Sequence, residues 1–445
     1  MAEPTPPPAS GQPVPVPKPP PAQNQALRML GIPNLPSKLP SRNWMIFWAV
    51  TTTITGAIIY DKREKKRTTA KWAHAVEHLA KEPLPNGLAQ VRKLTIYLSS
   101  PPGNGLRVAQ DHYTEYVKPI LAASGLDWEF VQGRREGDVR AVVAERARKI
   151  RRGWETSEDA TPDHEPTKDE IVEAHRKRNG IPEYEGVRGE VIIGRHTWKE
   201  YVRGLHEGWL GPLAPPPKPE PIPAAQTDGE SAEEKKPEGE ETPKSTRPPQ
   251  PRPHNTTNDY LTETLPLLTP SEFTPVVLIP EPHILGFLST PKRLVRFFNR
   301  RKLADDIGRE VAAACLLAYR DFKELPATGA DGATADQMQY EQEKELEWEE
   351  KDWIKTVWKD DPKEPVDTEV TEKILARPMV LDQRVASRMR RFELQPEQET
   401  RVKGIKVPEE EVEGWTKGKL RQLFRWGASQ FKSQRHVPVT GSDDE

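Results

Sequence analysis

Cysteine is nearly absent from this chain of 445 residues. The single thiol, Cys315, stands in the apolar run Ala-Ala-Ala-Cys-Leu-Leu, so an internal disulfide and a cysteine metal cluster are both excluded. We expect this thiol to be buried and inert, because a reactive cysteine needs a polar, charged setting. The histidines are scattered and form no His-Glu-x-x-His motif or other close ligand set, so the sequence predicts no metal site.

The chain also lacks a charge excess of either sign. Its 66 basic and 68 acidic residues give a net charge of -2, which argues against a general nucleic-acid binder. A secretory signal peptide is not expected, because the apolar segment begins late and no small-residue cleavage site follows it. A cleavable mitochondrial presequence is not expected either, because prolines interrupt any amphipathic arginine-rich helix near the start.

One uncharged stretch, residues 43–60, reads NWMIFWAVTTTITGAIIY. As a helix it would be about 27 Å long, slightly shorter than a hydrocarbon core of ~30 Å but within the range for a span. Trp44 and Trp48 lie near one end and Tyr60 at the other, where amphipathic rings prefer the membrane interface, and Gly56 offers a close-approach face. We therefore predict a single transmembrane helix that anchors the chain. The alternative is a buried helix or strand, because Thr-Thr-Thr-Ile-Thr also suits a strand.

Proline-rich segments divide the remaining chain. Residues 1–42 predict a disordered tail, or alternatively a ligand for SH3 or WW domains, and the proline- and glutamate-rich residues 212–262 predict a disordered linker. Two folded regions are left, an α/β domain at 61–211 and a mixed, helix-rich α+β region at 263–445.

The first folded region alternates helices and strands. We expect strands at 91–98, 128–132 and 189–193, and helices at 69–81, 107–123, 138–154 and 196–208. This order predicts a parallel sheet with covering helices, which is an α/β fold.

The loop Gly103-Asn104-Gly105 lies between a predicted strand and a predicted helix, where such folds bind phosphates. It is a weak candidate for a cofactor-binding site, and an ordinary tight turn is the alternative. The order of elements resembles the nucleotide-binding half of diacylglycerol-kinase-like lipid kinases. However, the Gly-Gly-Asp-Gly-Thr signature of that family is missing after the strand at Val191, so we expect a degenerate kinase-like fold without catalytic residues.

The second folded region predicts a buried strand at 273–279 and helices at 291–323, 336–358, 380–393 and 415–431. Arg293, Arg296 and Arg300 make the start of the first helix basic, which indicates either a solvated face or a contact with anionic lipid headgroups. The last helix is amphipathic and basic, so it could lie on a membrane, dock on a partner or pack in the core.

Several short segments carry a family resemblance: residues 30–44 (LGIPNLPSKLPSRNW), 60–64 (YDKRE), 93–97 (KLTIY), 191–195 (VIIGR) and 280–287 (PEPHILGF). Together they resemble the fungal fifty-four-kilodalton subunit of the mitochondrial inner-membrane carrier translocase. The resemblance covers nearly the whole chain, apart from the variable linkers.

The resemblance implies an inner-membrane protein with one span and a large domain in the intermembrane space. It implies a non-catalytic scaffold, without cofactor, for the complex that inserts multispanning carrier proteins. The partners implied are channel-forming and other membrane subunits, small intermembrane-space chaperones and inner-membrane lipids. The five basic residues among 62–67 oppose this orientation, because the positive-inside rule places the large domain on the cytosolic or matrix side. A membrane-associated, lipid-kinase-like nucleotide-binding enzyme and a cytosol-facing tether on another organelle are the alternatives.

Overall fold

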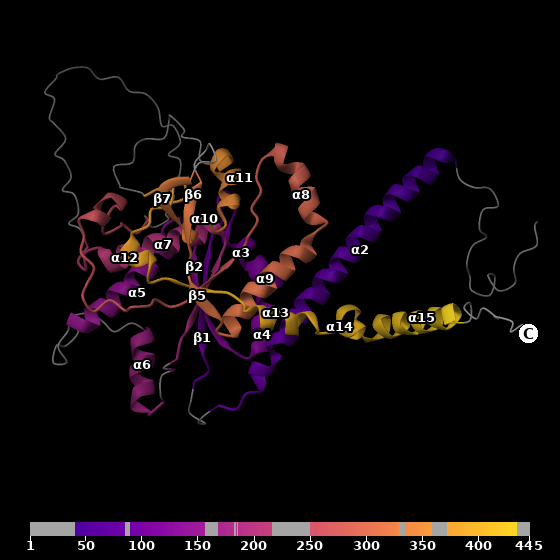
Figure 1. Ribbon diagram of the computed structural model, residues 1–445, viewed down its shortest axis with the longest axis horizontal. Coiled ribbons are helices and arrows are strands. Elements are labelled where there is room, and N and C mark those ends of the chain that lie inside the picture. Colours follow the sequence, from indigo (N-terminus) through magenta and orange to yellow (C-terminus); the bar gives the residue numbers. More distant parts are fainter. Residues whose placement is uncertain are drawn as a thin grey trace, which may run out of the picture. The chain divides into compact units, whose positions relative to one another are not determined.

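The computed structural model describes residues 41–84, 90–155, 168–181, 184, 186–215, 250–328, 334–357 and 372–433. The chain forms two compact units, residues 1–57 and 58–445. The described part of the first unit is the beginning of one helix, and the second unit contains the sheet (Figure 1). The predicted tail up to residue 40, most of the predicted linker and the last twelve residues of the sequence, 434–445, lie outside the described residues.

The helix α2 runs from Arg42 to Val76 and includes the uncharged stretch 43–60, so the helix predicted there is confirmed. Thr52 and Thr53 donate hydrogen bonds to the carbonyl oxygens of Trp48 and Ala49, at 2.6 and 2.7 Å, which satisfies both hydroxyls within the helix. Among the described residues, however, no helix contains a stretch that is both long and apolar enough to cross a bilayer. The predicted transmembrane span is therefore not found among the described residues.

A six-stranded sheet has the order β2-β1-β3-β4-β8-β5. Its first five strands are parallel, and β5 runs antiparallel to β8. The bounds are β1 Lys93–Ser99, β2 Asp127–Gly133, β3 Gly189–Ile193, β4 Val276–Ile279, β5 Tyr319–Asp321 and β8 Arg390–Phe392. The three strands predicted before residue 212 and the strand predicted near 273–279 are all present. Strands from both predicted folded regions therefore pair in one sheet, while the predicted domain boundaries themselves stay a prediction.

Helices cover both faces of the sheet, and apolar side chains alternate between two cores. Leu94, Ile96 and Leu98 of β1 face one core, and Tyr97 faces the other. The first core is closed by the end of α2, by α3 (Leu106–His112), α4 (Lys118–Ser124) and α9 (Arg300–Cys315); a π-helical turn, Tyr113–Val117, joins α3 to α4. The second is closed by α5 (Asp138–Glu155) and α7 (Arg195–Leu210), which lie on the opposite side in Figure 1. Central strands buried on both faces explain the continuous apolar runs Val-Ile-Ile and Val-Val-Leu-Ile.

Three helix predictions in the second region are wrong in part. The helix predicted at 291–323 is divided into α8 (Thr290–Phe297) and α9, and its end is strand β5. The helix predicted at 336–358 begins as β7 (Thr334–Tyr340), which pairs with β6 (Glu324–Thr328), and continues as α10 (Glu341–Lys344) and α11 (Glu347–Val357). The helix predicted at 380–393 is a single turn, α12 (Gln383–Ala386), followed by β8. Leu317 and Leu346 have φ angles of 56° and 59°, so the left-handed backbone there ends each helical run.

One further long helix and several short elements complete the described chain. The predicted helix at 415–431 is confirmed as α15 (Trp415–Ser433). The remaining elements are η1 (Glu77–Lys81), α6 (Lys168–Arg178), η3 (Thr257–Leu261), η4 (Phe287–Ser289), α13 (Pro396–Lys403) and α14 (Glu409–Glu413).

Candidate functional site

The loop Gly103-Asn104-Gly105 lies where the sequence predicts it, between the carboxyl end of β1 and the start of α3. Gly103 has a φ of 78°, and the backbone N–H of Asn104 donates to the carbonyl oxygen of Pro101 at 3.0 Å, which closes a tight turn. His283, from the segment after β4, contacts the carbonyl oxygen of Pro102 through Nε2 at 2.9 Å. The loop is therefore held by its own turn and by a neighbouring histidine. Ligand binding by these three residues stays a prediction.

Behind this loop, the carboxyl edge of the sheet contains buried ionisable side chains. The Glu349 carboxylate, from α11, accepts the backbone N–H groups of Arg195 and Glu281, each at 2.9 Å. It thereby connects α11 to the ends of β3 and β4. His196 donates from Nε2 to the carbonyl oxygen of Ser99 at 3.0 Å, which connects the start of α7 to the end of β1. These contacts join four segments at the edge where parallel sheets most often bind ligands.

Burial keeps the inner groups of this edge neutral. Desolvation raises the pKa of Glu281 to about 8 and lowers that of His196 to about 4. The Glu281 Oε2 atom lies 3.9 Å from His196 Nε2, and neither carboxyl oxygen has a hydrogen-bond partner among the described residues. Burial also raises the pKa of Glu349, while its two backbone donors favour the ionised form. At neutral pH, Glu281 is thus mainly a protonated acid beside an uncharged imidazole.

These side chains fill the carboxyl edge as a structural cluster. Within the described residues, no group of three or more histidine, cysteine or acidic side chains is arranged to hold a metal ion. Cys315 is buried, and desolvation raises the pKa of its thiol to about 11, so the thiolate nucleophile is disfavoured as predicted.

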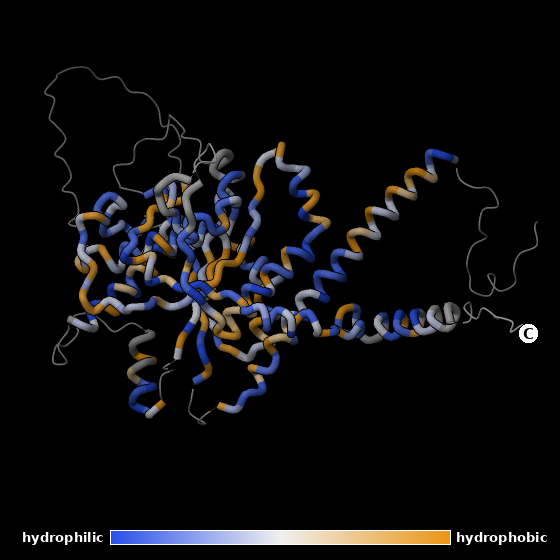
Figure 2. The backbone as a smooth tube through the Cα atoms, in the orientation of Figure 1, coloured by the Kyte–Doolittle hydropathy of each residue, from blue (hydrophilic) through white to orange (hydrophobic). Residues whose placement is uncertain are grey.

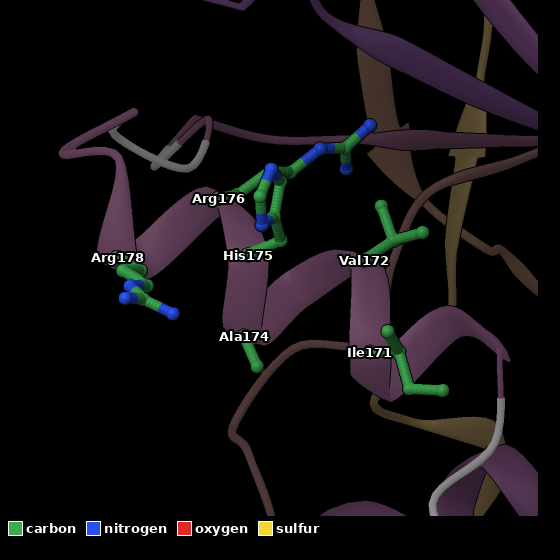
Figure 3. Close-up of a pocket in the computed structure, with 6 residues that line it drawn as sticks. All are labelled: Ile171, Val172, Ala174, His175, Arg176 and Arg178. Carbon is green, nitrogen blue, oxygen red and sulfur yellow. The ribbon is translucent and has the colours of Figure 1, made fainter.

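A surface hollow of about 500 Å³ runs along α6, lined by Ile171, Val172, Ala174, His175, Arg176 and Arg178 (Figure 3). All six come from this one helix, and they project from it in different directions in Figure 3. A small-molecule site needs polar groups that converge from several elements. This hollow therefore carries no chemistry.

The part of α2 that belongs to the second unit makes specific contacts with α9. Asp61 is buried, and its carboxylate accepts the backbone N–H groups of Arg300 and Arg301 at 3.2 and 3.3 Å, at the start of α9. This places a negative charge at the positive end of a helix dipole. The Arg301 guanidinium lies 5.1 Å from the centre of the Tyr60 ring. About three turns further along α2, Trp72 packs against Gly308 of α9 and donates from Nε1 to Asp305 of the same helix at 2.8 Å.

The basic residues that follow Tyr60 are partly neutralised in the fold. Arg63 forms ion pairs with Glu409 and Glu413 of α14, and Arg67 pairs with Glu409 at 2.7 Å. Lys65 pairs with Glu115. These pairs give the basic residues a structural role between α2 and its neighbours in the second unit.

Of the predicted membrane-anchor residues, Trp44, Trp48 and Tyr60 lie on α2 with side chains more than half exposed. Gly56 has open space around its Cα. Sequence reasoning missed Asp61, Glu281 and Glu349. Asp61 and Glu281 stand in the short segments that carry the family resemblance, but nothing local indicates their contacts, which join residues at least 68 positions apart.

Comparison with known proteins agrees with the predicted family. A family described as "Inner membrane protein import complex subunit Tim54" matches residues 24–392. A Neurospora crassa protein named mitochondrial import inner membrane translocase subunit tim54 is 63% identical, covering 95% of this chain and 92% of its own length. The protein of that name from Aspergillus oryzae is 44% identical over 84% of this chain and 89% of its own length. The Schizosaccharomyces pombe protein is 30% identical over 66% and 81%. The chain therefore belongs to the Tim54 family of inner membrane protein import complex subunits.

Proposed function

We propose that this chain is a non-catalytic scaffold subunit of the mitochondrial inner-membrane translocase that inserts multispanning carrier proteins. The observation that carries the proposal is the match to the Tim54 family over residues 24–392. In addition, relatives that are named as translocase subunits align with this chain over nearly their whole length. The channel-forming subunit, other membrane subunits and small intermembrane-space chaperones are the proposed partners.

The carboxyl edge of the sheet supports a scaffold role. His196, Glu281 and Glu349 occupy this edge with contacts that join chain segments. The alternative, a lipid-kinase-like nucleotide-binding enzyme, is not favoured. It would need positioned phosphate contacts and Mg²⁺ ligands, and the Gly103 loop is closed by its own turn.

We further propose that residues 43–60 anchor the chain in the inner membrane. The support is the lack of charge in this stretch and the exposure of its large apolar side chains, among them Ile54 and Ile58. Carbonate extraction of mitochondria tests the anchor: the wild-type chain should stay in the membrane pellet, and the variant Ile54→Lys/Ile58→Lys should move to the supernatant. Ile171→Lys, at an exposed isoleucine of α6, is the matched control and should stay in the pellet. Release of the wild-type chain would contradict the anchor.

For orientation, we propose that the large unit faces the intermembrane space. The charge rule opposes this, but Arg63, Lys65 and Arg67 have ion-pair partners in the fold, which accounts for their presence without reference to topology. Protease added to mitochondria with ruptured outer membranes should then digest the large unit. Complete protection while the inner membrane is intact would place it in the matrix instead.

The translocase role is tested by replacing the tim54 gene of Neurospora crassa with this chain carrying an affinity tag. After mild detergent extraction, the tagged chain should co-purify with inner-membrane translocase subunits, and carrier precursors should reach the carbonate-resistant inner-membrane fraction. Purification of the tagged chain alone, with carrier insertion as low as in the deletion strain, would refute the proposal.

A further inference from the structure

The segment between β4 and α9 combines strong positive charge with exposed apolar residues. Residues 282–304 contain no aspartate or glutamate and six basic residues: Lys292, Arg293, Arg296, Arg300, Arg301 and Lys302. The chain as a whole has nearly balanced charge, so this acid-free segment differs from the average. Such a combination is typical of peptide segments that lie on anionic membrane surfaces.

The apolar residues of this segment are exposed to an unusual degree. Phe287 and Leu288, in the turn η4, are 87% and 93% exposed, and Leu294 and Val295 of α8 are 56% and 62% exposed. Figure 2 shows hydrophobic residues in the chain that leads into α8 and a mixture of hydrophobic and hydrophilic residues along the helix. Single exposed apolar residues are normal on a protein surface, whereas this short segment exposes four large apolar side chains.

The exposure belongs to an ordered structure. Arg293 donates to the carbonyl oxygen of Gly286 at 3.0 Å and to the Thr290 hydroxyl at 3.2 Å, which holds η4 against α8. Thr290 donates in turn to the carbonyl oxygen of Phe287 at 2.6 Å. The turn that presents Phe287 and Leu288 is therefore fixed before any contact forms, so little further ordering is needed for binding.

The carboxyl end of this segment contacts the end of the uncharged stretch 43–60 and the residue that follows it. Arg300 and Arg301, which follow α8, are capped by Asp61, and Arg301 lies over the Tyr60 ring. The residues that directly follow α8 thus contact Tyr60 and Asp61, where the proposed membrane anchor ends. Positive charge and apolar side chains at this position complement an anionic bilayer surface.

We propose that η4 and α8 form a second membrane contact, in which Phe287, Leu288, Leu294 and Val295 enter the interfacial region of an anionic lipid bilayer while the neighbouring basic side chains bind headgroups. This contact rests on the proposed membrane location of the chain. It would hold the large unit against the membrane at a second point.

A site-specific fluorophore tests the contact in the full-length chain. Cys315 is buried, so a cysteine introduced by Leu294→Cys can be labelled selectively with an environment-sensitive dye. Leu267→Cys is the matched control, because Leu267 is also an exposed leucine but has no basic neighbours in the sequence. Each labelled protein is reconstituted into vesicles of zwitterionic lipid with or without 30 mol% cardiolipin, and brominated lipids serve as quenchers.

In cardiolipin vesicles the Leu294→Cys label should shift to shorter wavelength and be quenched by brominated lipid, whereas the Leu267→Cys label should show neither effect. Zwitterionic lipid, 1 M salt or the added changes Lys292→Gln and Lys302→Gln should reduce the quenching severalfold, since surface attraction is electrostatic. Protein that floats with the vesicles while its Leu294→Cys label is unquenched would overturn this inference and leave the anchor intact. A wavelength shift without lipid quenching would place the label in an apolar environment outside the bilayer and would also overturn the inference. Failure to float with cardiolipin vesicles would contradict both the anchor and this contact.

Discussion

Replacing Glu281 by methionine should stabilise the folded chain at alkaline pH and change it little at acidic pH. The Glu281 side chain is buried beside His196, and its carboxyl oxygens lack hydrogen-bond partners among the described residues. Desolvation raises its pKa from the ordinary value of 4.5 to about 8. Methionine has a similar length and no ionisable group, so it removes the cost of burying the charge.

The magnitude follows from the two pKa values. Between pH 4.5 and about 8 the folded state binds more protons at Glu281 than the unfolded state, so stability falls as pH rises through this window. One pKa unit corresponds to about 1.4 kcal/mol, so the cost is about 3 kcal/mol at pH 7 and reaches about 5 kcal/mol above pH 8. Below pH 4.5 both states are protonated and the cost disappears.

The assay is urea unfolding of the full-length chain in detergent, followed by tryptophan fluorescence at pH 5, 6, 7 and 8. The free energy of unfolding of Glu281→Met should exceed that of the wild type by an amount that grows with pH, from under about 1 kcal/mol at pH 5 to several kcal/mol at pH 8. Glu397→Met, at an exposed glutamate of α13, is the control and should show no such growth. An equal difference for Glu281→Met at pH 5 and pH 8 would show that the carboxylate is solvated, and would refute the reasoning.

Three further substitutions test the packing. Trp72→Ala should lower the free energy of unfolding by about 3–5 kcal/mol, measured by urea titration, because it empties the contact between α2 and α9, and a loss below about 1 kcal/mol would contradict that packing. Gly204→Ala should cost about 1–3 kcal/mol, because its Cβ would lie 2.5 Å from a carbonyl oxygen of α5, whereas Gly153→Ala, with open space on α5, should be neutral or stabilising in the same assay. Asp61→Ala should cost about 0.5–2 kcal/mol and speed hydrogen exchange in the first turn of α9, and unchanged exchange there would rule out the cap.

The central strands could be predicted from the sequence because their signal is local. β1 alternates, with Leu94, Ile96 and Leu98 on one face, and β3 contains the apolar run Val-Ile-Ile. Turns and amphipathic helices flank both strands, so the pattern alone gives a parallel α/β sheet. The elements between 291 and 393 could not be predicted in the same way. Tyr319–Asp321 becomes a strand because it pairs with Arg390–Phe392, about seventy residues away, and this pairing outweighs a local preference for helix.

In the candidate site, too, the locally encoded part could be predicted from the sequence and the part that depends on distant contacts could not. The Gly103 loop could be placed at the end of β1 from the order of strand, loop and helix. The cluster behind it could not, because Glu349 reaches the backbone of Arg195 and Glu281 only when α11 packs on the sheet edge. The short segments shared with the family gave the function without assigning a role to any of these residues.

The order of the strands has a consequence for how the polypeptide matures. β3 is bordered by β4, and β4 by β8, whose residues 390–392 come late in the chain. A precursor translated or imported only as far as residue 275 would end with the Val-Ile-Ile edge of β3 unpaired, a surface prone to intermolecular pairing. Premature stop codons upstream of β4 should therefore yield insoluble fragments instead of a functional half-protein, and quality-control proteases should remove them.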